Sequence, residues 1–335
     1  MLKFLKRFKK FFVFLIIFFF FIFLFSQGHI YKQNELKYGV TFSKQQAQSL
    51  GLNWQAVYQA IFSELGVKKI RLAAYWDEIE TDKGKFFWDD IDWQINTASA
   101  KGASIILAVG ARLPRWPECH FPEWTNKLSE AEKESQTLNY IQAVIDRYKS
   151  NNIIAWQVEN EPFLYGFGEC PVPKARFIDE EIALVRSLDN RPIVMTDSGE
   201  LSLWYLAAKR ADIFGTSIYR DTYSKTFKRY IHYPITPEFF RFKKNVVNMF
   251  AYPKKWIVIE LQAEPWGKEA LQNLSQEERA KTMTIDKFRE ILEFSRQAGF
   301  KEFYLWGAEY WYWEREKNNN PAYWEEAKGL FRNQL

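Results

Sequence analysis

Short apolar runs rich in β-branched residues alternate with longer helical stretches along most of this chain. Eight of the runs are predicted to be strands, and they cover residues 38–42, 69–74, 104–109, 153–158, 192–196, 213–218, 255–259 and 302–305. Several runs are apolar throughout, as is typical of a parallel sheet that is covered on both faces. Eight strand–helix units in about 300 residues predict an α/β fold of the closed (β/α)8 type, the TIM barrel.

The helical stretches between the runs have recognisable ends. Residues 54–65 and 88–101 are each followed by a glycine, which favours a helix stop. Residues 129–148 open with Ser and Glu at capping-box spacing, and a further helix is predicted over residues 275–299. A doubly wound open sheet is the alternative fold, but no Gly-rich phosphate-binding turn follows the first run.

The N-terminus has the pattern of an export signal. Residues 1–10 carry five basic and no acidic side chains, and residues 11–25 carry no charge at all. The apolar run is short for a spanning helix and long for a cleaved signal, and residues 26–28 (SQG) form only a fair cleavage site. We therefore expect an uncleaved signal anchor over residues 1–34 and one folded domain over residues 35–335. The domain would lie outside the cytoplasm, and it would be secreted if the leader were cleaved.

The net charge of +5 comes from 46 basic against 41 acidic residues, so it equals the five cations of the leader. The rest of the chain is balanced at 41 against 41, which gives no argument for nucleic-acid binding. Cysteine is limited to Cys119 and Cys170, with no Cys/His cluster that would indicate a structural zinc site. In an exported protein this pair predicts one disulfide, and two free thiols are the alternative.

The residues that follow the predicted strands carry the functional information, because a barrel of this kind places its active site at the C-terminal strand ends. The fourth run is followed by Glu159, Asn160 and Glu161, and the seventh by Glu260. A buried strand holds two carboxylates and an amide only at high cost, so this cluster is expected where the strand emerges into a cleft. Two strand-end glutamates on opposite sides of a barrel are what glycoside hydrolysis requires.

With these residues, the chain from about residue 36 onward resembles the clan of retaining glycoside hydrolases with (β/α)8 barrels, which includes cellulase-like, mannanase-like and xylanase-like families. Asn160 and Glu161 match the clan's motif at the end of strand four, and Glu260 matches its position at the end of strand seven. Three supporting positions, on strands two, six and eight, are matched by Arg71, Tyr219 and Trp306.

The resemblance implies that Glu161 is the general acid/base and Glu260 the nucleophile. The acid/base needs a pKa high enough to hold a proton, which a nearby carboxylate favours. The nucleophile must stay ionised, which a close Arg71 cation and a Tyr219 hydroxyl would support. A core ion pair is an equally weighted interpretation of Arg71.

The resemblance also implies substrate contacts. Asn160 would hydrogen-bond the 2-hydroxyl of the sugar being cleaved, and Trp306 would form the floor under that sugar. His120, in the loop after the third run, is expected to contact a sugar hydroxyl or to be structural. Six tryptophans lie in the predicted strand-end loops, namely Trp76, Trp116, Trp124, Trp266, Trp311 and Trp313. Two or three of them are expected to line sugar subsites, and the others are expected to be packing residues.

Other acidic residues near the strand ends have simpler interpretations. Glu159 is expected to be a salt-bridged support rather than a catalyst. Glu264 and Glu309 follow the seventh and eighth runs and could touch substrate, although acids in loops usually face water. Glu118 lies in the same loop as His120.

Together these patterns predict a retaining β-glycoside hydrolase that cleaves a β-linked oligo- or polysaccharide by double displacement through a glycosyl-enzyme intermediate. No metal or organic cofactor is expected, and the membrane would be contacted only through the leader. The alternative is a non-catalytic, membrane-tethered carbohydrate-binding barrel.

Overall fold

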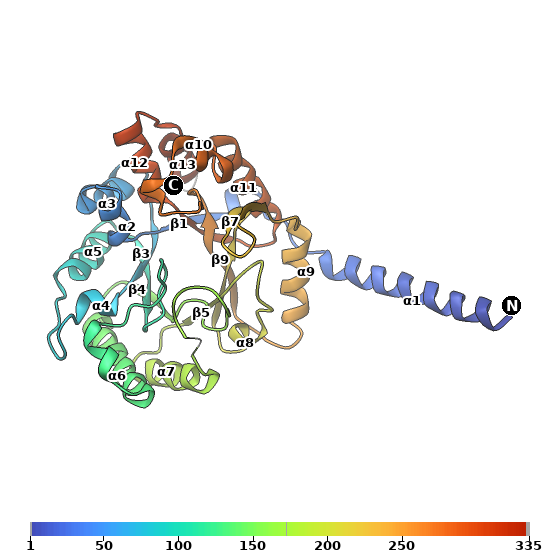
Figure 1. Ribbon diagram of the computed structural model, residues 1–335, viewed down its shortest axis with the longest axis horizontal. Coiled ribbons are helices and arrows are strands. Elements are labelled where there is room, and N and C mark those ends of the chain that lie inside the picture. The colour runs from blue at the N-terminus through green and yellow to red at the C-terminus, as the bar shows by residue number, and fades with distance from the viewer. Residues whose placement is uncertain (1, 172, 333–335) are drawn as a thin grey trace.

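The computed structural model describes residues 2–171 and 173–332, and its centre is a closed barrel of eight parallel strands (Figure 1). Around the barrel the strands follow the order β1-β2-β3-β4-β5-β6-β9-β10, and β10 closes onto β1. Their bounds are β1 (Lys37–Thr41), β2 (Lys69–Ala73), β3 (Ser104–Val109), β4 (Ile153–Val158), β5 (Ile193–Asp197), β6 (Ile213–Ile218), β9 (Lys255–Gln262) and β10 (Glu302–Trp306).

All eight predicted strands are therefore confirmed, and the open-sheet alternative is wrong because β1 and β10 pair along their full length. The pattern did not predict a small antiparallel hairpin after β6, which consists of β7 (Asp221–Ser224) and β8 (Arg229–His232). The hairpin strands are short and half-exposed, so they lack the apolar run by which the barrel strands were recognised.

Helices surround the barrel and cover the outer face of the sheet (Figure 1). They are α2 (Lys44–Ser49), α3 (Trp54–Ser63), α4 (Trp76–Ile79), α5 (Asp89–Ala100), α6 (Glu130–Tyr148), α7 (Ala175–Leu188), α8 (Tyr205–Ala208), α9 (Pro237–Val247), α10 (Gln276–Thr282), α11 (Ile285–Gln297), α12 (Ala308–Asn318) and α13 (Ala322–Arg332). The prediction of one continuous helix over residues 275–299 is wrong, because the segment is interrupted. Met283 is extended and Thr284 caps a new helix, so the segment forms α10 and α11.

The barrel has two apolar layers. The larger lies between the strands and the helices, and a smaller one fills the interior of the barrel with Ile106, Ala155, Val194, Ile259 and Tyr304, among others. Such filling makes the interior of an eight-stranded barrel a packed core rather than a pore. Polar side chains are therefore concentrated at the strand ends.

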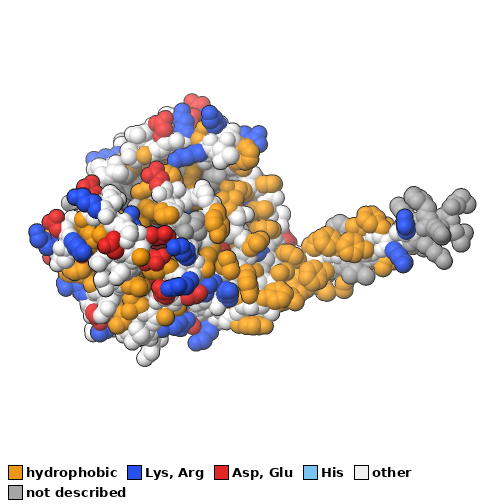
Figure 2. All heavy atoms as spheres, turned by 60° about the horizontal axis from the view of Figure 1, so that its bottom comes forward, with side chains coloured by type: hydrophobic (Ala, Val, Ile, Leu, Met, Phe, Trp, Pro, Cys, Tyr) orange, Lys and Arg blue, Asp and Glu red, His pale blue; other side chains and the backbone are white. Residues whose placement is uncertain are grey.

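The leader forms α1 (Leu2–Ser26), which projects away from the barrel beside α9 (Figure 1). The ring of Phe242 in α9 contacts Phe21 and Phe25, and hydrophobic side chains gather along α1 and at its junction with the barrel (Figure 2). Within the described part of the chain, no helix combines the length and the apolar character that crossing a membrane requires. The expected signal anchor is not confirmed.

Candidate active site

The Glu-Asn-Glu segment after β4 forms a sharp turn at the mouth of the barrel. Glu159 and Glu161 both adopt left-handed backbone conformations, with φ of 57° and 43°. Non-glycine residues take this conformation at a cost and mostly where the surroundings enforce it, often at functional sites. The turn directs the two glutamates to different partners.

Glu159 supports the turn. Its two carboxylate oxygens accept hydrogen bonds from the backbone amides of Ala111 (2.8 Å) and Arg112 (2.5 Å), in the loop after β3. The Arg112 guanidinium in turn donates to the carbonyl of Asn160 at 2.9 Å. Glu159 therefore supports the turn, as expected. Its partners are two backbone amides, whereas a salt bridge was expected.

Arg71, on β2, connects Gln157 of β4 and Asn160 just after it with Glu260 of β9. Its guanidinium donates to Gln157 Oε1 at 2.8 Å, to Asn160 Oδ1 at 2.7 Å and to Glu260 Oε1 at 2.7 Å. The side chain is completely buried, so each of these contacts is protected from water. Arg71 therefore fixes the positions of an amide and a carboxylate from opposite sides of the barrel.

Glu260 has a second donor, because the Tyr219 hydroxyl lies 3.2 Å from its Oε2. A cation therefore contacts one oxygen of the carboxyl group and a phenol hydroxyl lies near the other. Only 7% of Glu260 is exposed, so the carboxylate is largely shielded from water. Four of the residues that the sequence analysis selected, Arg71, Asn160, Tyr219 and Glu260, are therefore brought together.

Glu161 lies in a different environment. Its amide donates to Thr196 Oγ1 at 2.8 Å, and the Ser217 hydroxyl lies 3.3 Å from its Oε1. Burial, and then the negative charge of Glu260, raise the pKa of Glu161 well above its usual value. One glutamate is therefore suited to hold a proton while the other is paired with a cation.

Glu118 reaches the same space from the loop after β3. Its Oε2 accepts a hydrogen bond from Asn160 Nδ2 at 2.9 Å. Burial, and then the charge of Glu260, raise the pKa of Glu118 to about 8. Sequence reasoning noted Glu118 but did not place it in the site.

Trp306, at the end of β10, donates its indole N–H to Glu264 Oε1 at 2.9 Å. The guanidinium of Arg115 lies 4.1 Å from the centre of its ring and pairs with Glu264 at 2.5 Å and Glu309 at 3.5 Å. Glu264 and Glu309 are buried rather than facing water, because Arg115 supplies the compensating charge. One face of Trp306 is thus covered by a side chain, and its role as a sugar floor stays a prediction.

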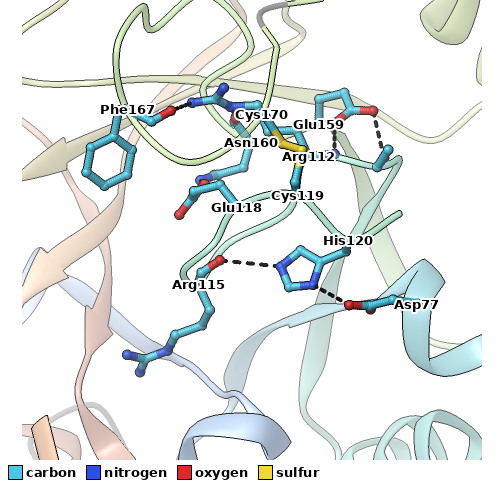
Figure 3. The surroundings of a disulfide bond; sticks show 11 residues. Asp77, Arg112, Arg115, Glu118, Cys119, His120, Glu159, Asn160, Phe167 and Cys170 are labelled. Atoms are coloured by element: carbon cyan, nitrogen blue, oxygen red, sulfur yellow. Dashed lines mark hydrogen bonds and ion pairs between the residues drawn. A yellow bond between two sulfur atoms is a disulfide. The ribbon is translucent and has the colours of Figure 1, made fainter. Parts of the chain in front are cut away.

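The predicted disulfide between Cys119 and Cys170 is confirmed, and it joins the loops that follow β3 and β4 (Figure 3). Beside it, His120 is 1% exposed, with Nδ1 3.2 Å from Asp77 Oδ2 and Nε2 3.3 Å from the carbonyl of Arg115 (Figure 3). Both ring nitrogens thus lie near protein oxygens, and a sugar contact by His120 stays a prediction.

A line of aromatic rings leads from the surface towards Glu260. The exposed Trp116 contacts Phe167, Phe167 contacts Trp266, and Trp266 contacts Tyr219, with ring centres 6.3, 5.8 and 5.1 Å apart. Trp266 is half-buried, as are Trp124 and Trp313 elsewhere in the strand-end loops. Trp76 and Trp311 are completely buried and serve as packing residues.

Several residues of the site were not selected from the sequence. They belong to the strand ends or to the loops after β3 and β5, and they are Arg112, Arg115, Gln157, Thr196, Ser217 and Glu200. The carboxylate of Glu200 accepts a hydrogen bond from the Tyr219 amide. The polar residues at the ends of β5 and β6 carry a usable signal, because a polar side chain in an otherwise apolar strand end points to the cleft. Among the described residues, no group of three or more His, Cys, Asp or Glu side chains is arranged to hold a metal ion.

Residues 27–169 match the family model of glycosyl hydrolase family 10. This segment contains β1 to β4 and Glu161, and it ends before Glu260. A curated relative, endo-1,4-β-xylanase 3 of Hypocrea jecorina, is 30% identical over 104 residues. That match covers 31% of this chain and 28% of the relative.

Solved structures of glycoside hydrolases share the fold. An endo-β-1,4-xylanase of family 10 from Gloeophyllum trabeum superposes with a TM-score of 0.58 at 16% identity, covering 88% of this chain and 96% of that one. A β-galactosidase from Rahnella sp. R3 reaches 0.60 at 12% identity, covering 89% and 55%. An exo-β-1,4-mannosidase from Opitutaceae bacterium strain TAV5 reaches 0.58 at 12% identity, covering 90% and 60%.

Proposed function

We propose that this chain, a (β/α)8 barrel of the glycoside hydrolase type, is a retaining β-glycoside hydrolase. The observation that carries the proposal is the pairing of two unlike carboxyl groups at one barrel mouth. Glu260 is held by the Arg71 cation and the Tyr219 hydroxyl, whereas burial and the charge of Glu260 raise the pKa of Glu161. The match to the family 10 model over residues 27–169 supports the same conclusion.

In the first step a carboxylate oxygen of Glu260 bonds to the anomeric carbon while the bond to the leaving oxygen breaks. Glu161 gives its proton to that oxygen. Asn160 hydrogen-bonds the 2-hydroxyl of the sugar, a contact that strengthens in the transition state.

In the second step water attacks the anomeric carbon, its proton passes to Glu161, and the bond to Glu260 breaks. The change of role follows from charge. Once Glu260 is esterified it no longer carries the negative charge that raises the pKa of Glu161, so Glu161 becomes a carboxylate able to accept a proton.

The substrate is a β-linked oligo- or polysaccharide. Because the curated relative is named an endo-1,4-β-xylanase, β-1,4-xylan is the first polysaccharide to test. The half-exposed Trp116 and the partly buried Trp266 offer flat surfaces on which further sugars would stack.

The test is hydrolysis of a panel of activated aryl β-glycosides and β-linked polysaccharides, followed by NMR of the first-formed anomer. Release of product with retained configuration is expected. In a crystal structure with a bound inhibitor the carboxyl groups of Glu161 and Glu260 should lie about 5–5.5 Å apart, because a larger gap is needed only for an intervening water. Binding without hydrolysis would favour the non-catalytic carbohydrate-binding barrel, and an inverted product would exclude the double displacement.

We also propose that residues 1–34 anchor the protein in a membrane, with the barrel outside the cytoplasm. Five cations before an uncharged apolar run support this orientation.

A further inference from the structure

The orientation of the Asn160 amide is fixed by its neighbours. Arg71 can only donate hydrogen bonds, so the Asn160 atom 2.7 Å from its Nη2 must be the carbonyl oxygen. The other end of the amide, Nδ2, therefore carries two donor hydrogens. One of them is used by Glu118 Oε2 at 2.9 Å, and among the described residues no other acceptor is recorded for Nδ2, so the second is open to a ligand.

Glu118 is held in place beside that amide. Its neighbour Cys119 is bonded to Cys170, and Gly168 approaches so closely that an added Cβ would lie 2.8 Å from the Cβ of Glu118. Glu118 is 5% exposed, and its side chain points to the same space as Asn160 (Figure 3). A carboxyl group buried and fixed in this way is costly unless it has a partner.

The two side chains present a donor and a carboxyl group at one point of the cleft. A hydroxyl group matches this pair, because it accepts from the amide and exchanges a second hydrogen bond with the carboxyl. A hydrogen atom at the same position makes neither bond. An acetamido group offers an N–H at that position, which can donate to the carboxyl but cannot accept from the Asn160 amide.

We infer that Glu118 is a specificity-determining residue that binds, together with Asn160, the 2-hydroxyl of the sugar being cleaved. The substrates are then β-glycosides with a free hydroxyl at C2, and 2-deoxy and 2-acetamido sugars are rejected. This inference rests on the proposed function, because it places the sugar over Glu260.

The experiment compares the best aryl β-glycoside of the panel with its 2-deoxy counterpart. The kcat/KM of each is measured for the wild type, for Glu118→Leu, which keeps the volume and removes the hydrogen bonds, and for Glu118→Gln, which keeps both an acceptor and a donor. Glu123→Gln, an exposed change further along the same loop, is the control. The two substrates differ in intrinsic reactivity, but this difference cancels when each variant is compared with the wild type on the same substrate.

Glu118→Leu should lower kcat/KM for the 2-hydroxy substrate by roughly tenfold to a hundredfold, and for the 2-deoxy substrate by less than about threefold. Glu118→Gln should recover most of the preference, and Glu123→Gln should keep all of it. An equal loss on both substrates would show that Glu118 only supports the loop, and would overturn the inference.

A second variant, Glu118→Asp, keeps the inference testable if Glu118→Leu does not fold, because the shorter side chain withdraws the carboxyl group from the sugar. Its loss in kcat/KM should be at least about threefold larger for the 2-hydroxy substrate than for the 2-deoxy substrate. Equal losses on the two substrates would overturn the inference and leave the proposed function intact. Failure of the wild type on every 2-hydroxy glycoside would instead reject the proposed function.

Discussion

Individual side chains divide the chemistry between two carboxyl groups of the same type. The carboxylate of Glu260 receives a guanidinium hydrogen bond at 2.7 Å, whereas the carboxyl group of Glu161 has the Ser217 hydroxyl 3.3 Å from its Oε1. A charged donor stabilises an ionised carboxyl far more than a hydroxyl does. The difference in role therefore arises from the partners that other strands supply, since both residues are glutamates near the C-terminal ends of their strands.

Substitution of the two glutamates should separate their roles. Glu260→Ala removes the nucleophile, so activity on all substrates should fall to background. Glu161→Ala removes proton transfer only, and aryl glycosides with acidic leaving groups need little protonation in the first step. Stopped-flow kinetics on a dinitrophenyl glycoside should show a burst followed by slow turnover. If folded Glu161→Ala hydrolyses natural and activated substrates as fast as the wild type, the assignment fails.

A second carboxyl pair lies behind the site, where Glu181 of α7 faces Glu159. Burial, and then the negative charge of Glu159, raise the pKa of Glu181 well above its usual value. Such a group contributes stability that is present below the unfolded-state pKa of about 4.3 and is lost as the pH rises through the folded-state pKa.

Glu181→Gln should remove this loss of stability at higher pH, because a glutamine side chain does not ionise. The free energy of unfolding of the variant, relative to the wild type, should therefore increase as the pH rises above about 4.3, by at most about 1.4 kcal/mol per pH unit. Urea titrations at several pH values measure it. The half-exposed neighbour Glu180 is the control, because Glu180→Gln leaves the Glu159–Glu181 pair in place. A difference for Glu181→Gln that falls with pH would contradict the prediction.

At the scale of elements, the loop after β3 determines the shape of the site. It carries Arg115 and Glu118, it is held by Glu159 through two backbone amides, and it is bonded to the loop after β4 by the disulfide. Gly110 begins the loop with a φ of +126°, and an added Cβ there would lie 2.3 Å from Glu159 Oε1. The loop therefore depends on a glycine, a carboxylate and a covalent bond at once.

Gly110→Ala should displace the Glu159 carboxylate and destabilise the protein by roughly 1–3 kcal/mol, with loss of most activity. Gly102→Ala is a matched control, because Gly102 also has a positive φ but has no atom within 4 Å of an added Cβ. It should cost about 1 kcal/mol and leave kcat/KM unchanged. Thermal unfolding and aryl glycoside assays measure both, and equal effects of the two changes would contradict the explanation.

Replacement of both cysteines by serine should lower the free energy of unfolding by roughly 2–4 kcal/mol, because the bond closes a loop with a sequence separation of 51. Denaturant unfolding of the wild type with and without reductant gives the same comparison. Wild-type protein with reductant should unfold at the denaturant concentration of the double variant. Two reactive thiols in untreated, folded protein would show that the bond does not form.

At the scale of the molecule, the barrel closes without the leader. The first strand begins at Lys37, and the described polar contacts of α1 and the residues just after it with the barrel come from Arg241 and Asn245 of α9. Deletion of the leader therefore exposes one side of α9 and leaves the strand-end face untouched.

A fragment starting at Glu35 should fold and keep the kcat/KM of the full chain within about twofold, since no residue of the site lies in the leader. The full chain should be found in the membrane fraction, and mass spectrometry should detect peptides from residues 1–34. A mature protein that starts near Gly28 in the soluble fraction would show that the leader is cleaved.

The barrel itself could be predicted from the sequence, because parallel strands covered on both faces require continuous apolar runs, and helices between them end at recognisable caps. The positions of Asn160, Glu161, Tyr219 and Trp306 at strand ends follow from the same runs, since the C-terminal end of each strand opens to one face. Arg71 lies within β2 as the runs predict, and Glu260 lies within β9, which extends to Gln262. These predictions depend only on residues close together in the chain.

Only the tertiary structure decided which of the charged loop residues meet. Arg115, Glu264 and Glu309 come from three loops far apart in sequence, and their burial depends on each other's charge. Glu118 reaches Asn160 because a disulfide and a close glycine fold one loop over another. Contacts of this kind depend on how loops close in three dimensions, and no local pattern in the chain encodes that closure.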